Sequence, residues 1–131
     1  MRLFFSYSSN DQALADQLRQ GFQELGVEVK DPGFAASGTH WAGRVRSSIE
    51  ESDAVLLIVP RSGAPGANNA FFEVGAAQAL GKPVMAVLPE EPAEEDREVP
   101  SDLAGQMVLG TSGRPMKSIA ASVVSALKVA A

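Results

Sequence analysis

Cysteine is absent from this chain of 131 residues, and histidine occurs once. Without thiols the chain can form neither a disulfide framework nor a thiolate metal site, and one imidazole offers too few ligands for a histidine site. We therefore expect no metal. No apolar run approaches the ~20 residues of a membrane span, and the first residues lack the basic head of a signal peptide. The expectation is a cytoplasmic protein without membrane contact.

An excess of positive charge is missing as well. The net charge is −5, and residues 90–98, with six acids and one base, account for all of it. The remainder carries ten acids and ten bases. Nothing in this balance predicts a nucleic-acid surface. A run of acids such as 90–98 is typical of a solvated loop.

Apolar segments alternate with helical patterns along the whole chain. Strands are expected at residues 2–7, 27–30, 53–59, 83–89 and 106–109. Helical spacing of apolar residues predicts helices from about residue 12 to 25, 41 to 52, 68 to 80 and 116 to 127. Ser9 and Gln12 fit a capping box for the first of these helices.

This alternation predicts a single α/β domain over residues 1–131. The third segment, residues 53–59, is apolar almost throughout, as expected of a parallel strand covered on both faces. With right-handed crossovers, the expected architecture is a three-layer, flavodoxin-like fold. Its five-stranded sheet is mostly parallel, in the order 2-1-3-4-5.

The architecture also predicts where a site lies. Ligands bind beyond the carboxyl ends of the strands where strand order reverses, here between the first and third strands. Ser6, Tyr7 and Ser8 arrive there from the first strand, and residues 60–69 from the third. Glu73 follows early in the next helix.

Glu73 is the acid on which a catalytic reading depends. Its neighbours three and four residues away on the helix, Asn69, Ala70, Ala76 and Ala77, carry no positive charge. The alternative is structural, because acids in the first turn of a helix favour the positive end of its dipole by ~0.3–1 kcal/mol. The position beside the predicted crevice favours the catalytic reading.

Several enzymes of this architecture are excluded by their missing motifs. A response regulator needs clustered acids after its first strand and an Asp after its third, where this chain has Ser6-Tyr7 and Pro60-Arg61. The three-glycine dinucleotide fingerprint and the phosphate loop are absent. His40 lies in a Gly-rich loop, without the strained turn of a serine hydrolase. Ser6, Ser8 and Ser9 fit a phosphate cradle less well than helix caps.

Four segments, in order, resemble the Toll/interleukin-1 receptor (TIR) domain family over residues 2–90. The first is similar to the family's Phe-Ile-Ser-Tyr box, which continues with small polar residues and Asp. The second resembles the Asp at the head of the family's mobile loop. The third is similar to the exit of that loop and the helix that follows it. The fourth resembles the helix that carries the family's catalytic Glu. In this sequence they are FFSYSSND at 4–11, Asp31, GTHW at 38–41 with IEESD at 49–53, and FEVGAA at 72–77 with LGKP at 80–83.

The resemblance implies cleavage of NAD between nicotinamide and ribose, with NAD as substrate and no cofactor. The products would be nicotinamide and ADP-ribose or a cyclic ADP-ribose isomer, in bacterial defence against phage. It further implies Glu73 as the catalytic carboxylate, Tyr7 and Trp41 as ring-stacking groups, and self-association through the 31–41 loop. Ser6, Ser8, Asp31, Phe34 and Asn69 complete the expected substrate-binding set. Asn69 departs from the family, in which many active members have Trp four residues before the Glu.

Two other functions remain open at this point. A nucleoside deoxyribosyltransferase shares the expected fold, and a similar Glu-x-Gly-x-Ala pattern leads to Gly-Lys-Pro. In such an enzyme the carboxylate would act as the nucleophile in a reaction that exchanges the base of a nucleoside. Many TIR domains, in contrast, only associate with themselves or recruit partners.

Overall fold

The computed structural model describes residues 1–30, 41–61, 63, 67–89, 97, 108–111 and 113–130. At residues 9, 41–45, 67–70, 129 and 130 it describes the backbone but not the side chains. The strands are β1 (Arg2–Ser6), β2 (Glu28–Lys30), β3 (Ala54–Ile58), β4 (Val84–Leu88) and β5 (Val108–Gly110). They form one sheet in the order β2-β1-β3-β4-β5, and every neighbouring pair is parallel. The expected α/β fold and strand order are confirmed.

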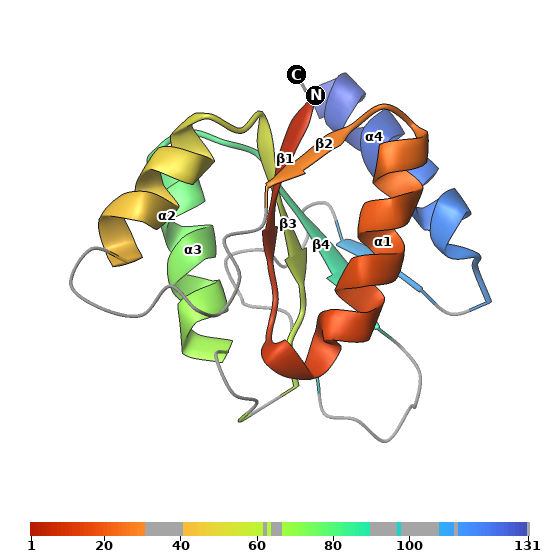
Figure 1. Ribbon diagram of the computed structural model, residues 1–131, viewed down its shortest axis with the longest axis horizontal. Helices are drawn as coiled ribbons and strands as arrows, with labels where there is room; N and C mark the ends of the chain where they lie inside the picture. The colour runs from red at the N-terminus through yellow and green to blue at the C-terminus, as the bar shows by residue number, and fades with distance from the viewer. Residues whose placement is uncertain are drawn as a thin grey trace.

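Helices cover both faces of the sheet and give the molecule three layers (Figure 1). The helices α1 (Gln12–Glu24) and α4 (Met116–Ala130) cover one face. The helices α2 (Trp41–Glu50) and α3 (Ala67–Ala79) cover the other. Both α1 and α3 begin at the end of the sheet where β1 and β3 finish (Figure 1). The switch point therefore lies between the tips of these two strands.

The core consists of two clusters, one on each face. Alternation along β1 sends Leu3 and Phe5 toward α1 and α4, and Phe4 toward α2 and α3. Phe5 meets Phe22 of α1 edge to face, with ring centroids 5.8 Å apart. All five residues of β3 are buried. β3 therefore lies at the centre of the core, where fully burying one Val, Leu or Ile side chain contributes about 1.5–3 kcal/mol.

The helices on the first face approach each other closely at Gly21 of α1. A Cβ placed there would lie 3.3 Å from the Cβ of Ala120 on α4. That distance is tighter than ordinary van der Waals contact, so a larger side chain would separate the two helices.

Two details of the expected first helix are wrong. Residues Ser9–Asp11 form a short 3-10 turn, α1 begins only at Gln12, and its N-cap residue Asp11 makes no side-chain capping bond. Asp11, and not Ser9, is therefore the N-cap residue of α1, and the side chain of Ser9 lies outside the described residues. Leu25 lies beyond the last turn and is 41% exposed, because the chain turns at Gly26 (φ 77°) and leaves the helix axis.

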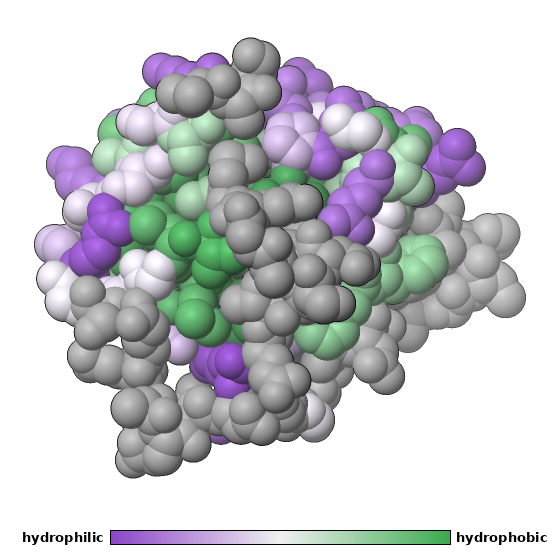
Figure 2. All heavy atoms as spheres, turned by 180° about the vertical axis from the view of Figure 1, so that it is seen from behind, coloured by the Kyte–Doolittle hydropathy of each residue, from purple (hydrophilic) through white to green (hydrophobic). Residues whose placement is uncertain are grey.

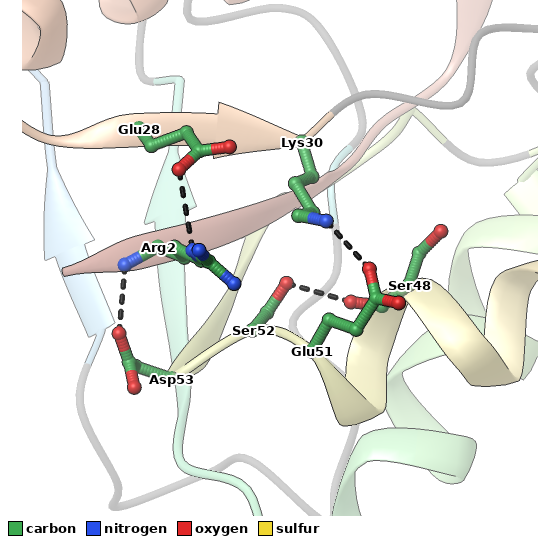
Figure 3. A network of polar contacts seen from close by, with 7 residues as sticks. All are labelled: Arg2, Glu28, Lys30, Ser48, Glu51, Ser52 and Asp53. Carbon is green, nitrogen blue, oxygen red and sulfur yellow. Dashed lines mark hydrogen bonds and ion pairs between the residues drawn. The ribbon is translucent and has the colours of Figure 1, made fainter.

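Ion pairs and hydrogen bonds hold the start of β1 to β2 and to the α2–β3 connection (Figure 3). The backbone N–H of Arg2 donates to Asp53 at 2.7 Å, and the Arg2 guanidinium lies 3.2 Å from Glu28. Lys30 contacts Glu51 at 2.6 Å. This network lies at the opposite end of β1 from Ser6.

Seen from behind, apolar side chains gather in the middle of the described surface and polar ones lie around them (Figure 2). Exposed large apolar residues among those described are Met1, Leu25, Phe71, Phe72 and Val108. No helix in the described part of the chain combines the length and apolar character needed to span a bilayer.

Candidate active site

A serine and a glutamate meet at the switch point from opposite halves of the chain. The Oγ of Ser6, the last residue of β1, donates a hydrogen bond to Oε1 of Glu73 on α3 at 3.2 Å. Ser6 lies opposite Leu57 of β3 in the sheet register. It shares the α3 side of β1 with Phe4, because side chains alternate along a strand. The parallel sheet thus brings together two residues 67 positions apart in sequence.

The burial pattern of α3 is the reverse of what polarity alone would produce. Glu73 is 8% exposed, whereas its neighbours Phe71 and Phe72 are 38% and 48% exposed. Glutamate is among the residues least often buried, and phenylalanine among those most often buried. A local rule broken in this way, without an evident gain in stability, is typical of a functional position.

The dipole explanation for Glu73 does not fit the helix. α3 begins at Ala67 and has no acidic residue in its first turn. Glu73 lies in the second turn, where the field of the helix terminus has largely fallen off. The stabilising role considered from sequence is therefore weak, and the position relative to Ser6 becomes the more informative fact.

The arrangement is suited to stabilising positive charge. An ionised carboxylate in a buried setting costs free energy unless hydrogen bonds compensate, and Ser6 supplies one such bond. A carboxylate has two oxygens with several acceptor sites, so it can accept more than one hydrogen bond at a time. In a low-dielectric setting, a fixed negative group interacts strongly with a cationic centre beside it.

Ser8 has a local structural role. Its Oγ accepts a hydrogen bond from the backbone N–H of Asn10 at 3.2 Å, and its carbonyl accepts one from Asp11 at 2.9 Å. These bonds close the turn between β1 and α1, as expected of a helix-start serine. The side chain of Ser9 lies outside the described residues.

Tyr7 does not face Glu73, contrary to the interpretation from sequence. Its ring is 5% exposed and belongs to the cluster under α1 and α4, on the other face of the sheet. Its hydroxyl contacts Gln12 Oε1 at 3.5 Å. The physical reason is the alternation of β1, which continues past the strand end and places residues 3, 5 and 7 on one face. This placement argues against a stacking role for Tyr7.

The other expected binding residues are described only in part. Trp41 is the first residue of α2, and Asn69 lies in the first turn of α3, the helix on which it is expected. The side chains of both lie outside the described residues. Asp31 and Phe34, with the whole 31–40 loop, lie outside them too, so their predicted roles stay predictions.

A buried ion pair next to the site was missed by the interpretation from sequence. Arg97 donates to Asp11 from both terminal guanidinium nitrogens, Nη1 and Nη2, at 3.0 and 2.8 Å, and Nη1 also donates to the Val59 carbonyl at 2.7 Å. The side chains of Arg97 and Asp11 are 6% and 7% exposed. The available signal was that Arg97 is the single base in the acidic run 90–98.

Comparisons with known proteins agree with this fold. A family model described as the TIR domain matches residues 3–114. Among solved structures, the CMP N-glycosidase BcmB of Clostridium botulinum is similar over 95% of this chain and 99% of that one, with a TM-score of 0.62 and 17% sequence identity. At that identity the likeness concerns the fold alone. A search of curated proteins finds no match.

Proposed function

The chain belongs to the TIR-domain family, and we propose that it is an N-glycosidase that cleaves NAD between nicotinamide and ribose. The observation that carries the proposal is the buried carboxylate of Glu73, held by Ser6 at the carboxyl end of the sheet. Ligands of such sheets bind at this place. The fold likeness to a CMP N-glycosidase, which by its name acts on the same type of bond, supports it.

Cleavage of the nicotinamide–ribose bond requires little from the protein beyond a negative charge held beside the ribose. In NAD the nicotinamide nitrogen is positively charged, so it leaves as a neutral base with the bonding electron pair. It therefore needs no acid to protonate it. The ribose left behind has oxocarbenium character, as in other glycosyl transfers. The Glu73 carboxylate stabilises this cation and binds ribose hydroxyls, while Ser6 fixes the orientation of one carboxylate oxygen.

The fate of the ribosyl cation sets the product. If water adds to the anomeric carbon and loses a proton, the products are nicotinamide and ADP-ribose. If a nucleophile elsewhere in the same ADP-ribosyl group adds to the anomeric carbon instead and a proton is lost, the product is a cyclic ADP-ribose isomer. We propose that the product serves as a signal in bacterial defence against phage, as the resemblance to the TIR family implies.

The test is incubation of the purified protein with NAD, followed by chromatography and mass spectrometry. Release of nicotinamide with one equivalent of ADP-ribose or a cyclic isomer is the expected result. Absence of nicotinamide release at several protein concentrations, from a folded sample, would contradict the proposal. The dependence on concentration also tests self-association through the 31–41 loop. A rate that rises faster than protein concentration indicates that association completes the site.

A second candidate is cleavage of a nucleotide or nucleoside. The fold likeness to the CMP N-glycosidase favours it, because the same buried carboxylate would serve a base–ribose bond. Parallel incubations with CMP, and with deoxyadenosine plus a free base, separate these substrates from NAD by product. Base exchange in the last incubation would indicate a deoxyribosyltransferase.

A role as an interaction module makes a different prediction. If the chain only recruits partners, Glu73→Ala leaves its function intact, whereas changes around Phe34 in the 31–40 loop abolish it. The buried, hydrogen-bonded state of Glu73 favours the enzyme, since an interaction module has no need of a carboxylate at this depth.

A further inference from the structure

The Asp11–Arg97 pair links the ends of the two strands that flank the switch point. The guanidinium of Arg97 donates to both carboxylate oxygens of Asp11, just before α1, and to the carbonyl of Val59, just after β3. All of these distances lie between 2.7 and 3.0 Å. Few side chains other than arginine could make these contacts, because the bonds need a planar group with several donors in fixed directions.

From Asp11 the linkage continues back to the end of β1. The backbone N–H of Asp11 donates to the Ser8 carbonyl at 2.9 Å, and Ser8 Oγ accepts from Asn10 at 3.2 Å. Ser8 is only two residues beyond Ser6, which binds Glu73. Hydrogen bonds therefore connect the end of β3, through Arg97 and Asp11, to Ser8, and the short backbone segment from Ser8 to Ser6 completes the connection to the Ser6–Glu73 contact.

The burial of this pair makes the linkage rigid. With the Arg97 and Asp11 side chains 6% and 7% exposed, solvent screens their attraction far less than it screens the surface pairs of this chain. Loss of one partner leaves the other charge buried without the attraction of the pair, which is strongly destabilising. The bidentate geometry adds orientation to this attraction. The Asp11–Arg97 pair therefore fixes both the orientation and the separation of the two segments that it joins.

We propose that Asp11 and Arg97 are positioning residues that hold the end of β1, and with it the Ser6–Glu73 contact, against the end of β3. As a statement about catalysis, this inference rests on the proposed function. Neither residue needs to touch substrate. Transition-state stabilisation depends on placement, and a displacement of about 1 Å can cost on the order of 100-fold in rate.

The principal variant is Arg97→Lys, which keeps the charge but loses the forked geometry. Its matched control is Arg2→Lys, which makes the same change in an exposed ion pair at the opposite end of β1. Steady-state kinetics on NAD are measured at a temperature where circular dichroism shows each variant fully folded. We expect Arg97→Lys to lower kcat at least about 10-fold with KM changed less than about 3-fold, because the loss falls on transition-state placement. The control should match the parent.

A double-mutant cycle adds a readout that general destabilisation would not reproduce. Asp11→Asn should lower kcat to a similar extent, and the double variant should lose little more than either single variant, because both act through one contact. If the double variant loses the product of the two single losses in kcat, or if folded Arg97→Lys keeps the parental kcat, the pair does not act as positioning residues for catalysis.

A measurement without substrate separates this inference from the proposed function. Amide hydrogen exchange at Asn10 and Asp11, whose N–H groups bond to Ser8, should be at least about 10-fold faster in Arg97→Lys, while Val55 in the centre of the sheet is unchanged. Unchanged exchange at Asn10 and Asp11 overturns the inference whatever the activity. If the parent cleaves no NAD but this exchange accelerates, the proposed function fails and the positioning role of the pair stands.

Discussion

Replacing Ser6 by alanine tests whether the Ser6–Glu73 hydrogen bond matters for chemistry. The change removes the Oγ that donates to Glu73 Oε1 at 3.2 Å and leaves the backbone of β1 as it is. Ser6 is 1% exposed, so the methyl of alanine stays buried and water does not simply take the place of the hydroxyl. The carboxylate then loses one of the groups that fix its orientation.

The magnitude follows from the geometry. A hydrogen bond to a charged group contributes about 1.5–3 kcal/mol, and a length of 3.2 Å places this one at the weaker end. Since about 1.4 kcal/mol corresponds to a factor of ten, we expect kcat to fall about 10-fold. KM should change little, because the bond orients the group that stabilises the transition state. Release of nicotinamide under saturating NAD, followed by chromatography, measures the effect.

The matched control is Ser52→Ala. Ser52 is also 1% exposed, and its Oγ donates to the Ser48 carbonyl at 2.7 Å, at the end of α2 away from the site. This control should lower the melting temperature and leave kcat at the parental value. If folded Ser6→Ala turns over NAD as fast as the parent, or if Ser52→Ala slows it equally, the reasoning is refuted.

Tyr7→Phe should keep kcat on NAD within about twofold of the parent, because Tyr7 packs in the cluster under α1 and α4. A loss of about 100-fold in kcat would show instead that the Tyr7 hydroxyl acts in the site. Gly21→Val should destabilise the fold by about 1–3 kcal/mol in urea unfolding by separating α1 from α4, whereas Gly75→Ala, with open space around it, should not. The hydrogen bond from Lys30 lowers the pKa of Glu51, so the pair stabilises the fold above the usual glutamate pKa of about 4.3 and loses this contribution as pH falls through the lowered value. Urea titrations from pH 6 to pH 3 should show a smaller decline for Glu51→Gln, and identical declines would contradict the assignment.

Much of the fold was predictable because local and global signals agree. The segment 53–59, apolar almost throughout, indicates a central parallel strand, and β3 is buried at all five positions. Strand number, order and the side of the sheet used for the site followed from alternation and handedness. The boundaries of α1 were less predictable, because the 3-10 turn at 9–11 competes with a regular helix start.

The site was predictable to the level of topology and no further. Topology places Glu73 near the end of β1, and the Ser6 contact agrees with this. The expectation that Tyr7 faces the site considers only its place at the strand end, whereas alternation along the strand puts Ser6 and Tyr7 on opposite faces of the sheet. Nor could the Asp11–Arg97 pair be foreseen, because the two residues are 86 positions apart and no periodicity relates a loop residue to its partner.

The most direct measurement is the rate of nicotinamide release from NAD by the parent chain and by Glu73→Gln. Glutamine keeps the size of the side chain and an oxygen that can accept the Ser6 hydrogen bond, but removes the negative charge. Glu51→Gln is the control at an exposed carboxylate. We expect turnover by the parent and by the control, and a loss of at least about 100-fold in folded Glu73→Gln. Turnover by Glu73→Gln equal to that of the parent would contradict this expectation.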